Sequence, residues 1–156
     1  RAALLITVVL HIVTAVQLYR RARAARPVGY QRLEPQASSF ASRTIRVGGF
    51  VLLGFIVFHL LHLTVGVVWP SEFKPTDAAG NMIRGFQRPA VAALYVVAML
   101  ALGLHLYHGI WSGPRSVGVP TPPVPLRKKV ALAIAVLVAG GFISIPLGAL
   151  AGILKP

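Results

Sequence analysis

The sequence predicts an all-α protein, a transmembrane helical bundle with four spanning helices that forms a single integral membrane domain over residues 1–156. Hydrophobic residues make up 56% of the chain and charged residues 12%, and the mean hydropathy is +0.73. A chain of this composition cannot solvate its own surface. Four apolar runs each approach or exceed the roughly 20 helical residues that cross a hydrocarbon core of about 30 Å.

The four runs are expected to be helices because lipid offers no hydrogen bonds, so each backbone polar group must find its partner within the segment. We place them at residues 2–19, 47–69, 89–111 and 126–154. The connectors contain helix breakers. They are an Arg-rich run at 20–46, a polar loop at 70–88 and a Pro-rich stretch at 114–125. Gly148 and Gly152, in the fourth run, form a generic motif for close helix packing.

The basic residues predict how the chain is oriented. The net charge is +13, and eleven of the 16 basic residues lie in the loops 20–46 and 112–129. Because Lys and Arg are enriched in cytoplasmic loops, we expect both loops to be cytoplasmic in a multi-pass protein of a bacterial inner membrane. Anionic lipid headgroups and soluble protein subunits would meet these charges, and we expect no nucleic-acid partner.

The chain has no initiator Met, and its first residues already belong to an apolar run. We therefore expect a further spanning helix to precede Arg1, which would give five helices in the intact subunit. The positive charges follow the first apolar run, so a secretory signal is not favoured.

All five histidines lie inside or at the edge of the apolar runs: His11, His59, His62, His105 and His108. An ionisable group at mid-membrane costs roughly 2.5 kcal/mol or more when charged, so such residues usually mark a functional pathway. Neutral imidazole is a strong iron ligand. With no cysteine in the chain, thiolate metal sites and covalent haem attachment are excluded. The pattern predicts haem held by coordination and packing.

Depth in the membrane predicts which histidines share an iron. His11 and His105 each lie nine residues before an inner boundary, at Arg20 and Pro114, which is about 14 Å along a helix. We expect them to be the axial ligands of one haem. His59 lies thirteen residues from Arg46, about 20 Å, and is expected to ligate a second haem nearer the outer face.

His62 and His108 lie one helical turn from the expected ligands. Two interpretations stay open for them: contacts to haem propionates or a quinone, and plain hydrogen bonds between helices. Zinc and proton transport are disfavoured because the three acidic residues, Glu34, Glu72 and Asp77, all lie in loops. A standalone di-haem cytochrome b and a haem-free anchor or transporter remain alternatives.

Several motifs resemble one family. They are Phe58-His59-Leu60-Leu61-His62, the segment from Tyr95 to His105-Leu106-Tyr107-His108-Gly109-Ile110-Trp111-Ser112, Phe142-Ile143-Ser144-Ile145-Pro146 and Ala41-Ser42-Arg43-Thr44. The chain is similar over essentially its whole length to the single-chain di-haem cytochrome b membrane anchor of bacterial succinate dehydrogenases and fumarate reductases.

The resemblance implies two b haems and electron relay to or from a quinone, expected to be menaquinone. It implies His11 and His105 as proximal haem ligands, and His59 as a distal ligand whose partner lies on a preceding helix. The implied partners are the flavoprotein and iron–sulfur subunits of succinate dehydrogenase, so the chain would be a subunit of an enzyme with no complete activity alone. The Arg-rich loops would either dock those subunits or act only as a topology signal.

Overall fold

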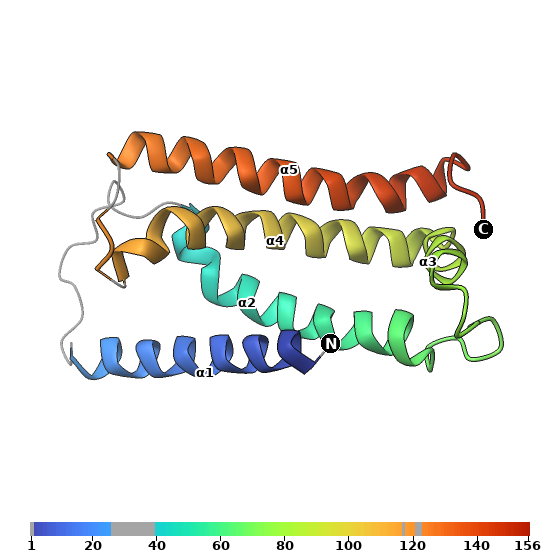
Figure 1. The fold of residues 1–156 in the computed structure, drawn as a ribbon, viewed down its shortest axis with the longest axis horizontal. Helices are drawn as coiled ribbons and strands as arrows, with labels where there is room; N and C mark the ends of the chain where they lie inside the picture. Colours follow the sequence, from blue (N-terminus) through green and yellow to red (C-terminus); the bar gives the residue numbers. More distant parts are fainter. Residues whose placement is uncertain (1, 26–39, 117, 121–122) are drawn as a thin grey trace. The chain divides into compact units, whose positions relative to one another are not determined.

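The computed structural model describes residues 2–25, 40–116, 118–120 and 123–156, and this part of the chain is helical with no strand. In order, the elements are α1 (Ala2–Ala24), α2 (Phe40–His59), the π-helix η2 (Leu60–Val65), α3 (Ala78–Phe86), α4 (Pro89–Ser116) and α5 (Val124–Leu150) (Figure 1). Four helical segments, α1, residues 43–65, α4 and α5, are long and apolar enough to cross a membrane. This confirms the predicted fold class.

The chain divides into two compact units, Arg1–Ala37 and Ser38–Pro156, and each is described by itself. In the first unit the structure describes the helix α1, in which no residue is buried. The hydroxyl groups of Thr7 and Thr14 donate to the backbone carbonyls of Ala3 and Leu10, both at 2.8 Å, so these polar groups are satisfied within the helix. Arg26 and Arg32, in the middle of the Arg-rich loop, lie outside the described residues.

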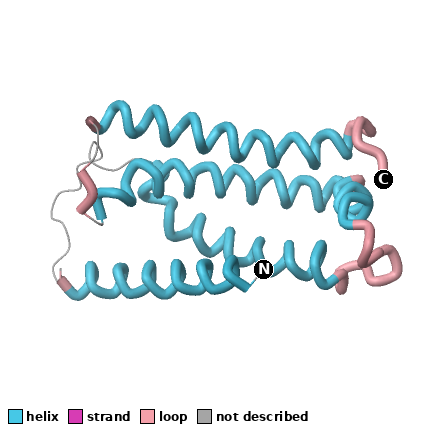
Figure 2. Tube along the Cα trace, in the orientation of Figure 1, coloured by secondary structure: helices cyan, strands magenta, loops and turns pink. Residues whose placement is uncertain are grey.

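In the second unit, α4 packs against both α5 and α2 (Figure 2). The α5 side of the contact carries a stripe of small residues four apart, Ala131, Ala135 and Ala139, all buried. A Cβ atom at Gly103 of α4 would lie 3.2 Å from the Cβ of Ala139. The two helices therefore approach closely because neither presents a large side chain, which is the usual way that helices pack in membranes.

The second span differs from its expected range. It begins earlier, with α2 starting at Phe40, and it ends in η2 at Val65 instead of continuing to residue 69. Gly66 closes the segment in the left-handed conformation, with φ of 78°, and its N–H donates to the carbonyl of Leu61. Trp69 therefore lies in the turn after the helix.

The prediction that residues 70–88 form only a polar loop was wrong in part, because residues 78–86 form the helix α3. Asp77 caps its start, with Oδ1 accepting from the backbone N–H of Gly80 at 2.8 Å. Ile83 and Phe86 are buried and form a core cluster with Val91 and Tyr95 of α4. The helix forms because a capping carboxylate and one apolar face coincide.

Gly148 and Gly152 do not form a helix-packing motif. Gly152 follows the end of α5 with φ of 70°, and the backbone N–H groups of Ile153 and Leu154 both donate to the carbonyl of Gly148. Gly152 thus provides the left-handed turn that ends the helix. Leu154 folds back so closely that a Cβ at Gly148 would lie 3.3 Å from its Cδ1.

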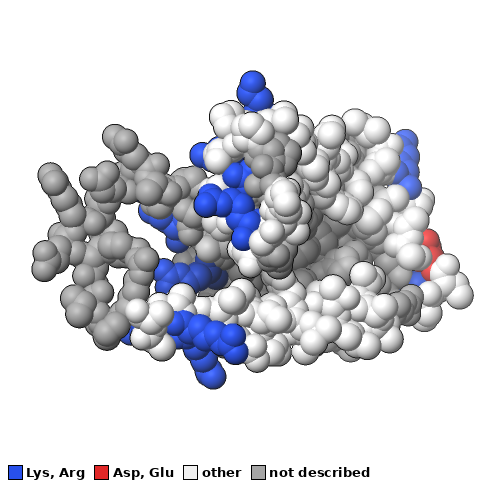
Figure 3. Space-filling view, turned by 60° about the vertical axis from the view of Figure 1, so that its left-hand side comes forward, with Lys and Arg blue, Asp and Glu red and all other residues white. Residues whose placement is uncertain are grey.

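Charged side chains in the described chain gather near the helix ends, and Figure 3 shows largely uncharged surface between them. Many large apolar side chains are exposed along the spans, for example Val97 and Leu100 of α4 and Leu137 of α5. Exposed apolar surface on this scale is expected of helices that face lipid.

Candidate functional site

Two of the histidines meet one tyrosine hydroxyl in the second unit. The oxygen of Tyr95, on α4, lies 3.0 Å from Nδ1 of His62 and 3.4 Å from Nδ1 of His59. His62 and Tyr95 are buried, with exposed fractions of 6% and 5%, and His59 is half-buried. A single hydroxyl therefore joins both histidines of the second span to the neighbouring span.

Aromatic side chains hold the Tyr95 ring in place. Phe55 and Phe86 contact it edge to face, with ring centroids at 4.9 Å and 4.6 Å. Phe58 adds a third contact at 6.1 Å. Such pairs contribute about 0.5–1.5 kcal/mol each beyond the area they bury. The tyrosine hydroxyl is thus positioned by packing that does not depend on its hydrogen bonds.

His62 is enclosed by α3 and by the turn after η2. A Cβ atom at Gly85 of α3 would lie 2.6 Å from Cε1 and Nε2 of His62, so only glycine leaves room for the imidazole. The Trp69 ring packs edge to face on it at 5.3 Å. His62 belongs to the π-helical segment, a local widening that often occurs at functional sites.

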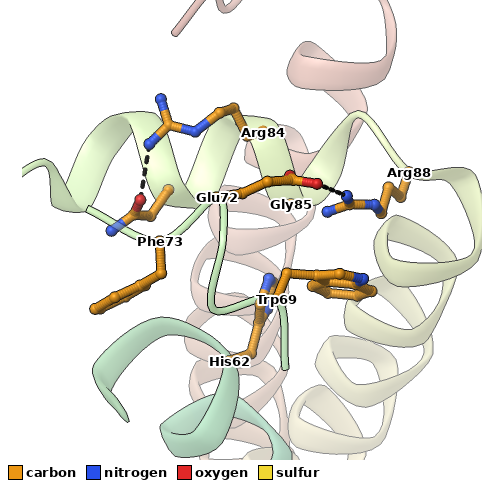
Figure 4. A pocket seen from close by; sticks show the side chains of 8 residues that line it. His62, Trp69, Glu72, Phe73, Arg84, Gly85 and Arg88 are labelled. Carbon is orange, nitrogen blue, oxygen red and sulfur yellow. Dashed lines mark hydrogen bonds and ion pairs between the residues drawn. The ribbon is translucent and has the colours of Figure 1, made fainter. Parts of the chain in front are cut away.

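A small polar cavity opens beside His62, as Figure 4 shows. Its volume of about 20 Å³ suffices for about one water molecule. At its rim, Glu72 accepts from Arg88 at 2.5 Å, and the Arg88 guanidinium lies 4.2 Å above the Trp69 ring. The lining residues are His62, Trp69, Glu72, Phe73, Asn81, Arg84, Gly85 and Arg88.

A polar network fixes α3 over this cavity. Asn81, which is buried, accepts from the backbone N–H of Lys74 at 2.9 Å and donates to its carbonyl at 2.7 Å. Arg84 donates to Asn81 at 2.7 Å and to Asp77 at 3.2 Å. The hydrogen bond from Gly80 N–H, followed by the bond and charge of Arg84, holds the pKa of Asp77 below its usual range.

Acid should loosen α3 through Asp77. Because the pKa is lower in the folded chain, the carboxylate stabilises the helix above its ordinary value of about 4, and this stability is lost as pH falls through the folded pKa. We expect the protection factors of the α3 backbone amides, which correct the exchange rates for their intrinsic pH dependence, to fall on acidification of the wild type. Asp77→Asn is the control, because asparagine still caps the helix but cannot titrate. An equal acid response in both proteins would contradict this role.

An apolar cavity of about 240 Å³ lies between α2 and α4. Its walls come from α2 (Val51, Gly54, Phe55, Phe58) and α4 (Leu94, Val97, Ala98). No side-chain atom lies within 4 Å of a Cβ placed at Gly54, so the wall is open there. The cavity is smaller than the roughly 300–1,000 Å³ of typical small-molecule sites, and it does not by itself enclose a macrocycle.

The other two histidines of the second unit lie towards the far end of α4. His105 and His108 are both half-buried, and His108 packs edge to face on Trp111 at 5.7 Å. Within the described residues, Nδ1 of His108 and Nε1 of Trp111 are buried without a hydrogen-bond partner. Arg127, 9% exposed, donates to the Trp111 carbonyl at 2.9 Å, and Lys128 lies 5.2 Å from the Trp111 ring.

The structure thus brings together His59 and His62, through a residue that the sequence analysis did not single out as a site residue. Depth counting gives a partial signal for it: Tyr95 lies about 28 Å above Pro114, against about 24 Å for His62 and about 20 Å for His59 above Arg46, so the count places Tyr95 near His62 but not near His59. His11 is exposed on α1, in the first unit, so its pairing with His105 stays a prediction.

No group of three or more His, Cys, Asp or Glu residues within the described ranges is arranged to hold a metal ion by protein ligands alone. Haem iron needs only one or two protein ligands, because the porphyrin supplies the others. Comparisons with protein families, curated proteins and solved structures find nothing that matches this chain. The resemblance to the cytochrome b anchors therefore rests on the sequence motifs alone.

Proposed function

We propose that this chain is the membrane-anchor cytochrome b subunit of a bacterial succinate:quinone oxidoreductase. In this role it conducts electrons through b haems between an iron–sulfur subunit and a membrane quinone, expected to be menaquinone. Succinate is handled by the partner flavoprotein. The basic segments 20–46 and 112–129, whose ends belong to helices in the structure, face the cytoplasm, where they meet the soluble subunits and the anionic lipid headgroups of the inner membrane.

One observation carries the proposal: the Tyr95 hydroxyl stands at Nδ1 of His59, inside a spanning helix. A histidine that ligates a metal almost always makes a hydrogen bond through its other ring nitrogen, which fixes the tautomer and the orientation of the ring. With Nδ1 engaged, Nε2 of His59 is the nitrogen left for iron. An apolar environment and a satisfied second nitrogen are what an axial ligand requires.

The donor set suits haem, since neutral imidazoles are its commonest protein ligands and the apolar cavity beside Phe55 and Phe58 adds a nonpolar wall. When bound, haem supplies reversible one-electron transfer. His59 would hold the distal haem from one side, and the resemblance assigns the opposite ligand to a preceding helix. We therefore expect α2 and α4 to enclose the distal haem only in part.

At the other end of α4, His105 and His11 are the proposed ligands of the proximal haem. His108 and Trp111 offer buried nitrogens without hydrogen-bond partners among the described residues. Buried polar groups are nearly always satisfied, so such atoms call for a partner beyond the described residues. Haem propionates or a quinone carbonyl would satisfy them, and this supports an auxiliary role for His108. For His62, the bond to Tyr95 favours the helix-to-helix alternative.

Reduction by succinate tests the proposal. In membranes that contain the native complex, succinate should reduce b haem, as seen in a reduced-minus-oxidised spectrum. A matched strain without the iron–sulfur subunit should lose reduction by succinate but keep reduction by dithionite. Haem in a chain that purifies without flavin or iron–sulfur subunits, and that succinate does not reduce, would indicate a standalone cytochrome b. Absence of any haem signal would indicate a haem-free anchor or transporter.

A further inference from the structure

We propose that Tyr95 is a positioning residue for the distal haem. Its hydroxyl oxygen accepts a hydrogen bond from the Nδ1–H of His59, and its O–H donates a hydrogen bond to Nδ1 of His62. This inference rests on the proposed function, because it assumes that His59 ligates iron. It assigns a role to the hydroxyl that neither the histidine pattern nor the motifs imply.

The direction of the two hydrogen bonds follows from the ligand chemistry. If iron takes Nε2 of His59, the neutral ring carries its proton on Nδ1, so this nitrogen must donate. The only acceptor that the described chain places there is the Tyr95 oxygen, at 3.4 Å. Tyr95 then has its own proton to donate, and Nδ1 of His62 lies 3.0 Å away.

His62 is suited to accept this proton. A neutral imidazole with its proton on Nε2 presents a bare Nδ1 towards the tyrosine. Its Nε2 edge lies against Gly85, beside the small cavity that has room for about one water molecule. Hydrogen bonds in a chain polarise one another, so donation to His62 makes the Tyr95 oxygen a better acceptor for His59.

The chain of bonds should lower the reduction potential of the distal haem. The hydrogen bond from Nδ1–H of His59 to the Tyr95 oxygen makes the His59 ring a stronger electron donor to the iron. A stronger donor favours ferric over ferrous iron. Replacing the hydroxyl by hydrogen should therefore raise the potential. Phe55, Phe58 and Phe86 hold the ring by its faces and edges, so phenylalanine should occupy the same place.

A redox titration of the native complex with Tyr95→Phe tests the inference. At a fixed ambient potential, we expect the ratio of ferrous to ferric distal haem to rise about tenfold, which is about 59 mV for a one-electron couple. The distal haem is identified as the one that His59→Ala removes. Tyr107→Phe, which removes a hydroxyl from the same helix about 18 Å along, should leave the distal potential unchanged.

His62→Phe gives a second reading that keeps the Tyr95 hydroxyl. It should raise the distal potential too, but the ratio of ferrous to ferric distal haem should rise by less than tenfold. The Tyr95 hydroxyl loses its acceptor in this variant but stays beside His59. An unchanged or lowered distal potential in Tyr95→Phe, with haem content intact, overturns the role of Tyr95 and leaves the proposed function standing. Absence of haem from the wild-type complex overturns both.

Discussion

His105→Ala is expected to remove one haem from the native complex and to spare at least part of the other. An axial imidazole supplies one of the two protein bonds to the iron, and a methyl group cannot replace it. His105 lies on α4, whereas His59 lies at the end of α2, so the two sites share no ligand. Haem content per complex, measured with the redox-difference spectrum, checks this result.

Two variants bracket this prediction. His59→Ala should remove the other haem, leaving the one that His105→Ala abolishes. His108→Ala is the matched control, since it removes an imidazole one turn further along α4 and should leave both haems bound. Loss of neither haem in His105→Ala would contradict the ligand assignment, as would loss of haem in His108→Ala alone.

Gly66→Ala should destabilise the protein by about 2–5 kcal/mol. Its φ of 78° is a left-handed conformation, which costs an L-residue about 1–2 kcal/mol. The added methyl group would also collide with the Phe73 ring, and overpacking of this kind costs about 1–3 kcal/mol. Because Gly66 closes η2, the damage should extend to His62 and Tyr95.

Gly152→Ala separates the two causes. Gly152 has a similar φ of 70°, but nothing lies within 4 Å of a Cβ placed there. Gly152→Ala should be destabilised only by the left-handed backbone conformation, by about 1–2 kcal/mol. Thermal unfolding of both variants in detergent checks the difference. Equal destabilisation would show that Phe73 yields at no cost.

The spanning helices could be predicted from the sequence because lipid leaves the backbone no other option, and hydropathy alone then finds the segments. The helix α3 was missed because residues 70–88, Asp77 among them, were interpreted as a polar loop. In the folded chain, Asp77 is the cap of a helix whose apolar face, Ile83 and Phe86, packs on α4. The capping residue and the apolar spacing were both visible in the sequence, but nine residues are too few for a hydropathy signal.

The candidate site was predicted only in part. The position of the histidines in apolar runs indicates metal or haem binding, but it does not reveal what their second nitrogens contact. Depth counts assume straight, regular helices, and η2 breaks this assumption directly after His59. The meeting of Tyr95 with two histidines depends on side-chain geometry across two helices, which periodicity within one helix does not contain. The spacing of Gly148 and Gly152 was misread for a different reason: it does not show that α5 ends at Leu150, which places Gly152 in the turn after the helix.

Haem quantification in the purified native complex, combined with its reduced-minus-oxidised absorption spectrum, decides whether this chain is a cytochrome b. We predict a Soret band and two noncovalent b haems for each copy of the subunit, one dependent on His105 and the other on His59. A complex that contains this chain but shows no Soret band would contradict the proposed function.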